Sequence, residues 1–444
     1  MPKAGKIQLI KYAPPPAELP VYGKVPPSEV SYVGRTNYIA ALEEKRFVFG
    51  IKRSDRRRHV YIIGKSGMGK SKFLELLMRQ DVVLGQGFCL IDPHGDLIED
   101  ILNFIPKNRI DDVCLIDPTF SSPPVLFNPL ADVDPNYKHQ FTESLIEILK
   151  KQFDVNWTPK VEYIFRFASL ALLDCPGATM QRFVSLLTDE KYREETINFI
   201  KDETVRRFWA EEFSGWVKNH EIDSIILLVN KLNQLLSNPV LKKMFGSNEN
   251  LVDLKKLVQD RKIILVNLAK GKLGEDASNF FGSVFIAKMK EVGMARVAVP
   301  GSLAEDFYFY IDEFNNLATE TFENLLADSR KYGICMTIAN QYLSQLSRMV
   351  QAAILGNVGT VVVFRISGED AERLEAEMMP VFKSKDMINL GTQEFYIKMT
   401  IDGETYDPFS AETLKVLPAP HQSLKEEIIA ASLRKYSVSQ GPSH

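Results

Sequence analysis

Cysteine and histidine are scarce in this 444-residue chain, which contains four of the first and six of the second. The histidines are scattered without the spacing of a zinc site, and the cysteines lie far apart, mostly within apolar runs. These features argue against a disulfide framework and against a structural zinc. We therefore expect small buried side chains in a reducing compartment at Cys89, Cys114, Cys175 and Cys335.

Long hydrophobic runs are also missing. No apolar stretch approaches the roughly 18 residues that a membrane helix requires, and the N-terminus has no apolar signal-peptide core. The net charge of −3 excludes a global basic field, so any contact with nucleic acid has to be local. The length suits two domains, or one large domain with an insertion. We expect a soluble, cytoplasmic chain.

A glycine-rich loop follows the short apolar run 60–63 and precedes a helical pattern at 72–78. Its sequence fits the pattern G-x-x-x-x-G-K-[ST], with residues Gly64, Lys65, Ser66, Gly67, Met68, Gly69, Lys70 and Ser71. In such a loop the backbone N–H groups surround a phosphate chain, the lysine reaches the β- and γ-phosphates and the hydroxyl binds Mg²⁺. The strand–loop–helix context predicts an ATP- and Mg²⁺-binding P-loop in preference to a flexible turn.

Further apolar runs predict a sheet. They are typical of buried strands and lie at 88–91, 113–116, 263–266, 307–311, 334–338, 360–364 and 394–398. Such continuous runs with helices between them indicate an α/β fold whose mostly parallel sheet is covered on both faces. Ligands of such sheets bind beyond the carboxyl ends of the strands. We therefore expect the polar residues discussed next to lie on one edge with the P-loop.

The strand 307–311 ends in two acids, Asp312 and Glu313. In P-loop enzymes an aspartate there holds the Mg²⁺ shell, and a neighbouring glutamate orients or deprotonates the attacking water. Alone, an exposed acidic pair at a strand end would be the simpler interpretation. Gln341 follows the strand 334–338 and is placed to sense the γ-phosphate or the water, although a loop amide without a role competes with that hypothesis.

Arg330 and His94 each allow a structural and a functional interpretation. Arg330 closes the expected helix 319–331, with Gly333 as its C-cap. There it either stabilises the helix dipole or acts as an arginine finger on a neighbouring subunit's nucleotide. Asp92 is a further strand-end acid near the site, and the adjacent His94 is expected to be structural.

The chain divides by composition into four parts. Residues 1–35 are rich in proline and predict an extended arm; residues 36–136 and 259–417 predict the ATPase domain. Residues 137–258 follow helical spacing and predict an all-α insertion, and residues 418–444 form a tail. Residues 46–63 suggest a hairpin whose turn is basic and solvated, with a nucleic-acid contact as the less favoured alternative.

Six ordered stretches resemble the TraG/TraD-type coupling ATPases of conjugative type IV secretion, within the HerA–FtsK group of motor ATPases. They are HVYIIGKSGMGKS, CLIDPHGDL, YIDEF, ADSRKYG, ANQYLSQL and DPFSAETL. The resemblance extends over about residues 46–417, and the helical insertion matches as well. It implies a RecA-like P-loop domain in a hexameric ring that uses ATP to move DNA or a protein–DNA complex.

The resemblance also implies roles and partners. Lys70 and Ser71 take the Walker A roles, Asp312 and Glu313 the Walker B roles, Gln341 the sensor and Arg330 the finger. Expected partners are DNA, further copies of the chain, and secretion-channel or relaxase-type proteins. Typical coupling proteins begin with two membrane helices that this chain lacks; a partner's anchor at the inner membrane face, a soluble relative and a truncated form are the alternatives.

Two other functions stay open at this stage. One is an ATPase that powers protein secretion or pilus assembly, which would be indifferent to DNA. The other is a nucleotide switch that recruits partners without hydrolysis, against which the acidic pair Asp312 and Glu313 argues.

Overall fold

Strand β3 (Val60–Ile63), which leads into the glycine-rich loop, lies inside a 12-stranded sheet in the computed structural model. The structure describes residues 10–39, 46–120, 124–153, 157–219, 223–297 and 305–437. The strand order is β2-β1-β12-β10-β9-β3-β8-β7-β4-β6-β5, and β11 pairs with β10. The other strands are β1 (Val30–Thr36), β2 (Val48–Lys52), β4 (Phe88–Asp92), β5 (Val113–Ile116), β6 (Ile263–Asn267), β7 (Phe307–Ile311), β8 (Ile334–Asn340), β9 (Thr360–Val363), β10 (Glu394–Ile401), β11 (Glu404–Thr405) and β12 (Phe409–Thr413).

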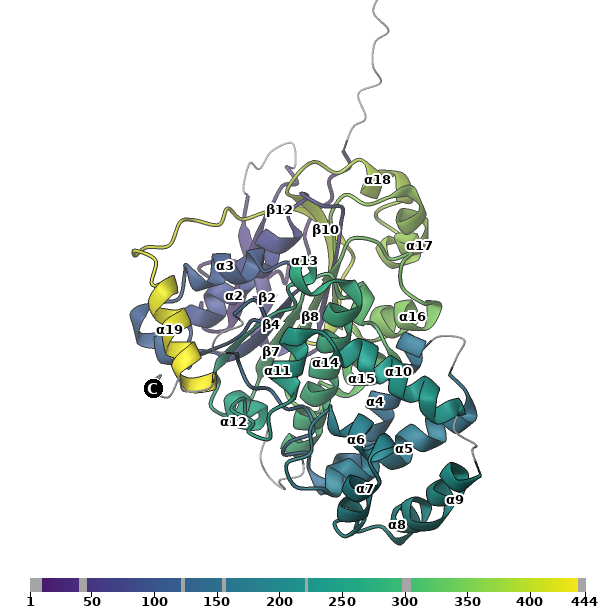
Figure 1. Cartoon of the computed structure of the whole chain (residues 1–444). Helices are drawn as coiled ribbons and strands as arrows, with labels where there is room; N and C mark the ends of the chain where they lie inside the picture. Colours follow the sequence, from purple (N-terminus) through teal and green to yellow (C-terminus); the bar gives the residue numbers. More distant parts are fainter. Residues whose placement is uncertain are drawn as a thin grey trace, which may run out of the picture.

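The strands from β9 to β5 in this order run parallel to one another. Side chains alternate between the faces of a strand, so Val60 packs into one hydrophobic cluster and Tyr61 into the other. Helices α2 (Lys70–Val83) and α3 (Asp96–Leu102) cover one face, whereas α14 (Glu275–Val297) and α15 (Glu320–Asp328) cover the other (Figure 1). The expected parallel sheet, buried on both faces, is confirmed.

The remaining strands extend this sheet in antiparallel fashion. β10 pairs with β9, β12 with β10, and β1 lies between β12 and β2. The expected hairpin over 46–63 is therefore wrong, because β2 pairs with β1 while β3 lies between β9 and β8. The prediction of an arm over 1–35 is also wrong at its end, since residues 30–35 belong to β1; residues 1–9 lie outside the described residues.

Two arginines of the basic segment between β2 and β3 are buried, which corrects the expectation of a solvated turn at these positions. The segment forms the short helix α1 (Arg53–Arg56), whose two arginines are at most 8% exposed. Both pair with the fully buried Asp81 of α2, at 2.7 Å from Arg53 and 2.9 Å from Arg56. Tyr310 of β7 also donates to Asp81. A partner distant in the sequence thus compensates the cost of burying these charges.

The described residues between 137 and 259 contain helices and no strand. Most of them gather at the lower right of Figure 1, away from the sheet. They are η2 (Pro135–Tyr137), α4 (Lys138–Phe153), α5 (Pro159–Asp174), α6 (Arg182–Thr188), α7 (Glu190–Ile197), α8 (Glu203–Arg207), the π-helical turn η4 (Phe208–Glu212), α9 (Phe213–Lys218), α10 (Asp223–Leu236), α11 (Pro239–Phe245) and α12 (Leu254–Gln259). Helix α4 packs on α14 and α15 of the sheet layer. The division into a separate inserted domain stays a prediction.

The expected tail contains a helix, α19 (Lys425–Tyr436), which packs beside β5 and α3. The prediction of a tail over 418–444 is thus corrected for this segment. No helix in the described parts of the chain combines the length and apolar character needed to cross a bilayer. The elements not yet given are η1 (Lys107–Asp112), α13 (Lys270–Leu273), η5 (Phe314–Leu317), α16 (Arg348–Asn357), α17 (Gly368–Met378) and α18 (Ser384–Ile388).

Candidate functional site

The P-loop connects the end of β3 with the start of α2. Gly67 and Gly69 have φ values of 75° and 125°, which only glycine adopts without strain. A Cβ on Gly64 would lie 2.5 Å from Cβ of Phe364. The loop therefore needs glycine at Gly67 and Gly69 for the backbone conformation, and at Gly64 because a side chain would not fit. The N–H groups of the first turn of α2 have no intrahelical acceptors, which suits an anion at this end.

Lys70 lies across the loop. It is only 6% exposed, and its ammonium donates to the carbonyl oxygens of Gly64 at 2.7 Å and Lys65 at 3.3 Å. Burial lowers the pKa of Lys70, while the charges of Asp312 and Glu313 act in the opposite direction. The ammonium is thus held by neutral carbonyls, and a phosphate chain would supply the anionic partner that the loop lacks.

The acids at the end of β7 lie beside the P-loop. The Ser71 hydroxyl is 3.3 Å from a carboxylate oxygen of Asp312, which is 8% exposed. Burial and the nearby charge of Asp92 together raise the pKa of Asp312 to about 6, against the opposing charge of Lys70. A hydroxyl and a buried carboxylate are the hard oxygen ligands that Mg²⁺ prefers. This donor set fits a magnesium nucleotide, and the cation would favour the ionised form of Asp312.

Each carboxylate oxygen of Glu313 has a hydrogen-bond partner. Its backbone is in the left-handed region, with φ 47° and ψ 48°, and its N–H donates to Asp312 at 3.0 Å. One carboxylate oxygen accepts from the Gln341 amide. The other lies 3.0 Å from Nε2 of His94. The structure therefore brings together Lys70, Ser71, Asp312, Glu313 and Gln341 as the sequence predicts, and adds His94.

Asp92 places His94. Its carboxylate accepts from the N–H of His94 at 3.0 Å, and from Leu97 and Ile98 at 2.9 and 3.1 Å. Asp92 thus stabilises the loop and the start of α3. The sequence favoured a structural role for His94, and the signal that was missed is positional: its loop follows β4, which lies next to β7.

Arg365 is a second residue that sequence reasoning missed. It follows β9, the neighbour of β3, so its position beyond the strand's carboxyl end puts it at the P-loop edge. Its carbonyl accepts from the N–H of Lys65 at 2.9 Å, and its guanidinium lies 3.0 Å from the sulfur of Met68. A cation is therefore available to the phosphate site from the same chain.

Arg330 does not lie on the active-site edge, and that expectation is wrong. Helix α15 follows β7 and returns to the amino-terminal edge of the sheet, ending at Asp328 rather than at 331. Arg330 lines a pocket of about 300 Å³ together with His59 and Gly359, which directly precede β3 and β9. It is exposed, and within the described ranges no carboxylate pairs with it. Arg330 cannot reach the nucleotide site of its own chain.

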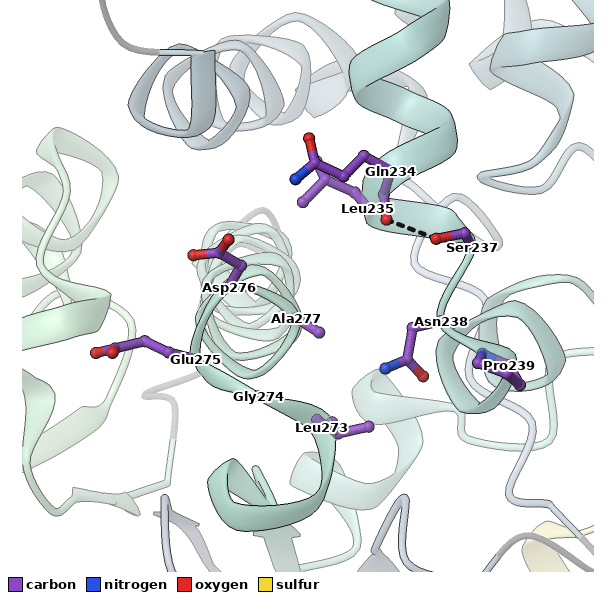
Figure 2. Close-up of a pocket in the computed structure, with 10 residues that line it drawn as sticks. All are labelled: Gln234, Leu235, Ser237, Asn238, Pro239, Leu273, Gly274, Glu275, Asp276 and Ala277. Carbon is purple, nitrogen blue, oxygen red and sulfur yellow. Dashed lines mark hydrogen bonds between the residues drawn. The ribbon is translucent and has the colours of Figure 1, made fainter.

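A larger pocket of about 520 Å³ lies between the end of α10 and the start of α14 (Figure 2). Its walls include none of the predicted site residues. One of its lining residues, Glu275, accepts from Asn316 at 3.2 Å, just beyond Glu313 in the chain. This pocket borders the segment that follows β7 without forming part of the P-loop site.

A family model for the type IV secretion-system coupling protein DNA-binding domain matches residues 49–380. The chain belongs to this family. Members with solved structures share its fold: TrwB in an unbound form has a TM-score of 0.62 and 14% identity, covering 84% of this chain and 88% of that chain. TrwB in complex with ADP and Mg²⁺ has a TM-score of 0.62 and 15% identity, covering 84% of this chain and 89% of that chain.

Two further proteins are similar as well. VirB4 of Thermoanaerobacter pseudethanolicus has a TM-score of 0.57 and 13% identity, covering 83% of this chain and 94% of that chain. The DNA double-strand break repair helicase HerA of Saccharolobus solfataricus is 22% identical over 290 residues, 64% of this chain and 50% of HerA. The chain therefore spans about half the length of that relative. The resemblance to TraG/TraD-type coupling ATPases and the RecA-like P-loop fold are confirmed.

Proposed function

We propose that this coupling-family chain hydrolyses Mg²⁺-ATP and uses the energy to translocate DNA, or a protein–DNA complex, as a hexameric ring. The observation that carries the proposal is the position of Glu313, whose carboxylate lies beside the P-loop, between Gln341 and His94. The name of the matched family, a DNA-binding domain, supports DNA as the partner. Solved TrwB complexes with ADP and Mg²⁺ and with an ATP analogue support the nucleotide.

Each residue of the site would have a separate role in ATP binding and hydrolysis. Lys70 and the loop N–H groups would bind the phosphates, and Ser71 and Asp312 would hold Mg²⁺. Bound Mg²⁺ neutralises charge on the phosphate oxygens. Glu313 would accept a proton from the attacking water, and Gln341 fixes the orientation of the Glu313 carboxylate. Together these groups account for binding, orientation and proton removal.

Arg330 would act on a neighbouring subunit. In a closed ring the interface is heterologous, so one face of each subunit meets a different face of the next. An exposed arginine at the sheet edge opposite its own P-loop is suited to such a contact. Arg365 is the alternative source of positive charge, acting within its own chain.

The test is phosphate release measured with no DNA, with single-stranded DNA and with duplex DNA, alongside the mass of the assembly. Lys70→Ala should lose nucleotide affinity, because the phosphate charge is no longer compensated. Glu313→Gln should bind ATP but turn it over slowly, since an amide cannot accept the proton. Lys72→Ala is the matched control, because Lys72 is exposed and pairs with Glu75 and Asp100 instead of the P-loop.

Each outcome separates the candidate functions. DNA-stimulated turnover by a hexamer supports the translocase. Turnover that ignores DNA would instead indicate an ATPase for protein secretion or pilus assembly. Nucleotide binding without phosphate release would indicate a switch. Normal turnover in Glu313→Gln would remove that residue from the mechanism.

A further inference from the structure

His94 and Gln341 hold the two oxygens of one carboxylate. Gln341 follows β8, His94 follows β4, and Glu313 follows β7, the strand between them. Nε2 of His94 lies 3.0 Å from Oε2 of Glu313, and Nε2 of Gln341 donates to Oε1. Loops from the strands on either side of β7 thus fix the side chain at its end.

The chemistry of the pair assigns the donor. An ionised carboxylate only accepts hydrogen bonds, so Nε2 of His94 is the donor in this contact. Each carboxylate oxygen has two acceptor sites, and one on each oxygen stays available for a water. The two donors therefore restrict the rotation of Glu313 without blocking its use as a base.

The backbone of its loop places His94 within reach of Glu313. Asp92 accepts from the N–H of His94 at 3.0 Å, and Gly95 follows with φ 92°. A Cβ on Gly95 would lie 2.9 Å from Nδ2 of Asn267 on β6, so the loop passes closely over the next strand. His94 itself is 53% exposed on its side chain, so packing of the ring does not explain its orientation. The contact with Glu313 does.

We propose that His94 is a positioning residue for ATP hydrolysis, which holds the Glu313 carboxylate in the orientation that accepts the proton of the attacking water. The inference rests on the proposed role of Glu313. The carboxylate ends a flexible side chain on a left-handed backbone, and a misplacement of about 1 Å at a reacting group costs on the order of a hundredfold in rate. Losing one of two donors is expected to cost kcat about tenfold to a hundredfold.

The test compares His94→Ala with His94→Gln, whose amide N–H is a donor of similar reach, and with His139→Ala on the exposed surface of α4. Steady-state kcat and KM are measured with binding of a fluorescent ADP analogue and thermal unfolding. His94→Ala should lower kcat about tenfold to a hundredfold while ADP affinity and the unfolding temperature stay unchanged. His94→Gln should restore most of the rate, and His139→Ala should match the parent.

A double variant separates this inference from the proposed function. If His94 acts through the carboxylate of Glu313, His94→Ala should add little to the loss of kcat caused by Glu313→Gln. A parental kcat in His94→Ala, with Glu313→Gln slow, overturns the inference alone. A change in ADP affinity with unchanged kcat also overturns it, because His94 would then be a nucleotide contact. Normal turnover in Glu313→Gln defeats the proposed function instead.

Discussion

Replacing Arg330 by alanine tests whether the ring completes its sites between subunits. An arginine finger supplied by a neighbour contributes about 10³–10⁵ in turnover, or roughly 4–7 kcal/mol of transition-state stabilisation. As a helix-end cation Arg330 would contribute only about 0.3–1 kcal/mol of stability. It is exposed and pairs with no carboxylate in the described part of the chain, so Arg330→Ala should fold normally, bind ATP and lose nearly all hydrolysis.

Mixing variants shows in which chain the arginine acts. In a ring assembled from equal amounts of Arg330→Ala and Lys70→Ala subunits, about a quarter of the sites combine an intact P-loop with a neighbour's intact Arg330. Phosphate release should therefore recover to about a quarter of the parental rate per site if the sites fire independently. Arg365→Ala is the matched comparison, because Arg365 lies against the P-loop of its own chain. Mixing Arg365→Ala with Lys70→Ala subunits should restore no phosphate release beyond that of the Arg365→Ala subunits themselves.

Two results would refute the reasoning. Hydrolysis by Arg330→Ala within a few-fold of the parent would leave Arg330 as a helix cap, and Arg365 would become the candidate for the phosphoryl charge. An inactive Arg330→Ala that Lys70→Ala subunits cannot rescue would mean that Arg330 acts through the fold of its own chain.

Three further predictions concern stability and coupling. Asp81→Asn leaves two buried guanidiniums without their carboxylate and should cost about 3–5 kcal/mol in urea unfolding; a loss below about 1 kcal/mol would contradict this. Burial lowers the pKa of His59 to about 4 from 6.5, so at this position only the unfolded chain gains a proton as pH falls from 7.5 to 5, which destabilises the parent by about 2 kcal/mol relative to His59→Asn; an equal pH dependence of stability in the two proteins would refute it. Lys151 of α4 donates to carbonyls of Asn316 and Ala318, at 2.9 and 3.2 Å, so Lys151→Ala should keep basal phosphate release and reduce its stimulation by DNA. Unchanged stimulation would show that this contact of α4 does not transmit the effect of DNA to the nucleotide site.

Local patterns predicted the P-loop and the strands well. The loop is specified within Gly64–Ser71, because its conformation depends on its own glycines. The central strands are continuous apolar runs because both faces of the parallel sheet are covered. The expected runs therefore matched β4 to β9 to within a few residues.

The errors came from information that local patterns do not carry. Arg53 and Arg56 read as a solvated turn because their partner, Asp81, lies beyond the P-loop in the sequence. Arg330 follows Glu313 closely in the chain, yet one helix is enough to carry it to the opposite edge of the sheet. Residues far apart in the sequence are therefore in contact in one case, and residues close in the sequence lie on opposite edges of the sheet in the other.

The order of the strands decides which polar residues meet at the site. A parallel sheet sends every strand end to one edge, so Asp92, Glu313, Gln341 and Arg365 all had to emerge near the P-loop. Neighbourhood within that edge follows from the order β9-β3-β8-β7-β4, which the sequence does not state. That order puts β7 between β8 and β4 and so lets two loops grip one carboxylate. It also puts β9 beside β3 and brings Arg365 to the P-loop. Chemistry that depends on single residues was therefore predictable, whereas chemistry that depends on pairs required the topology.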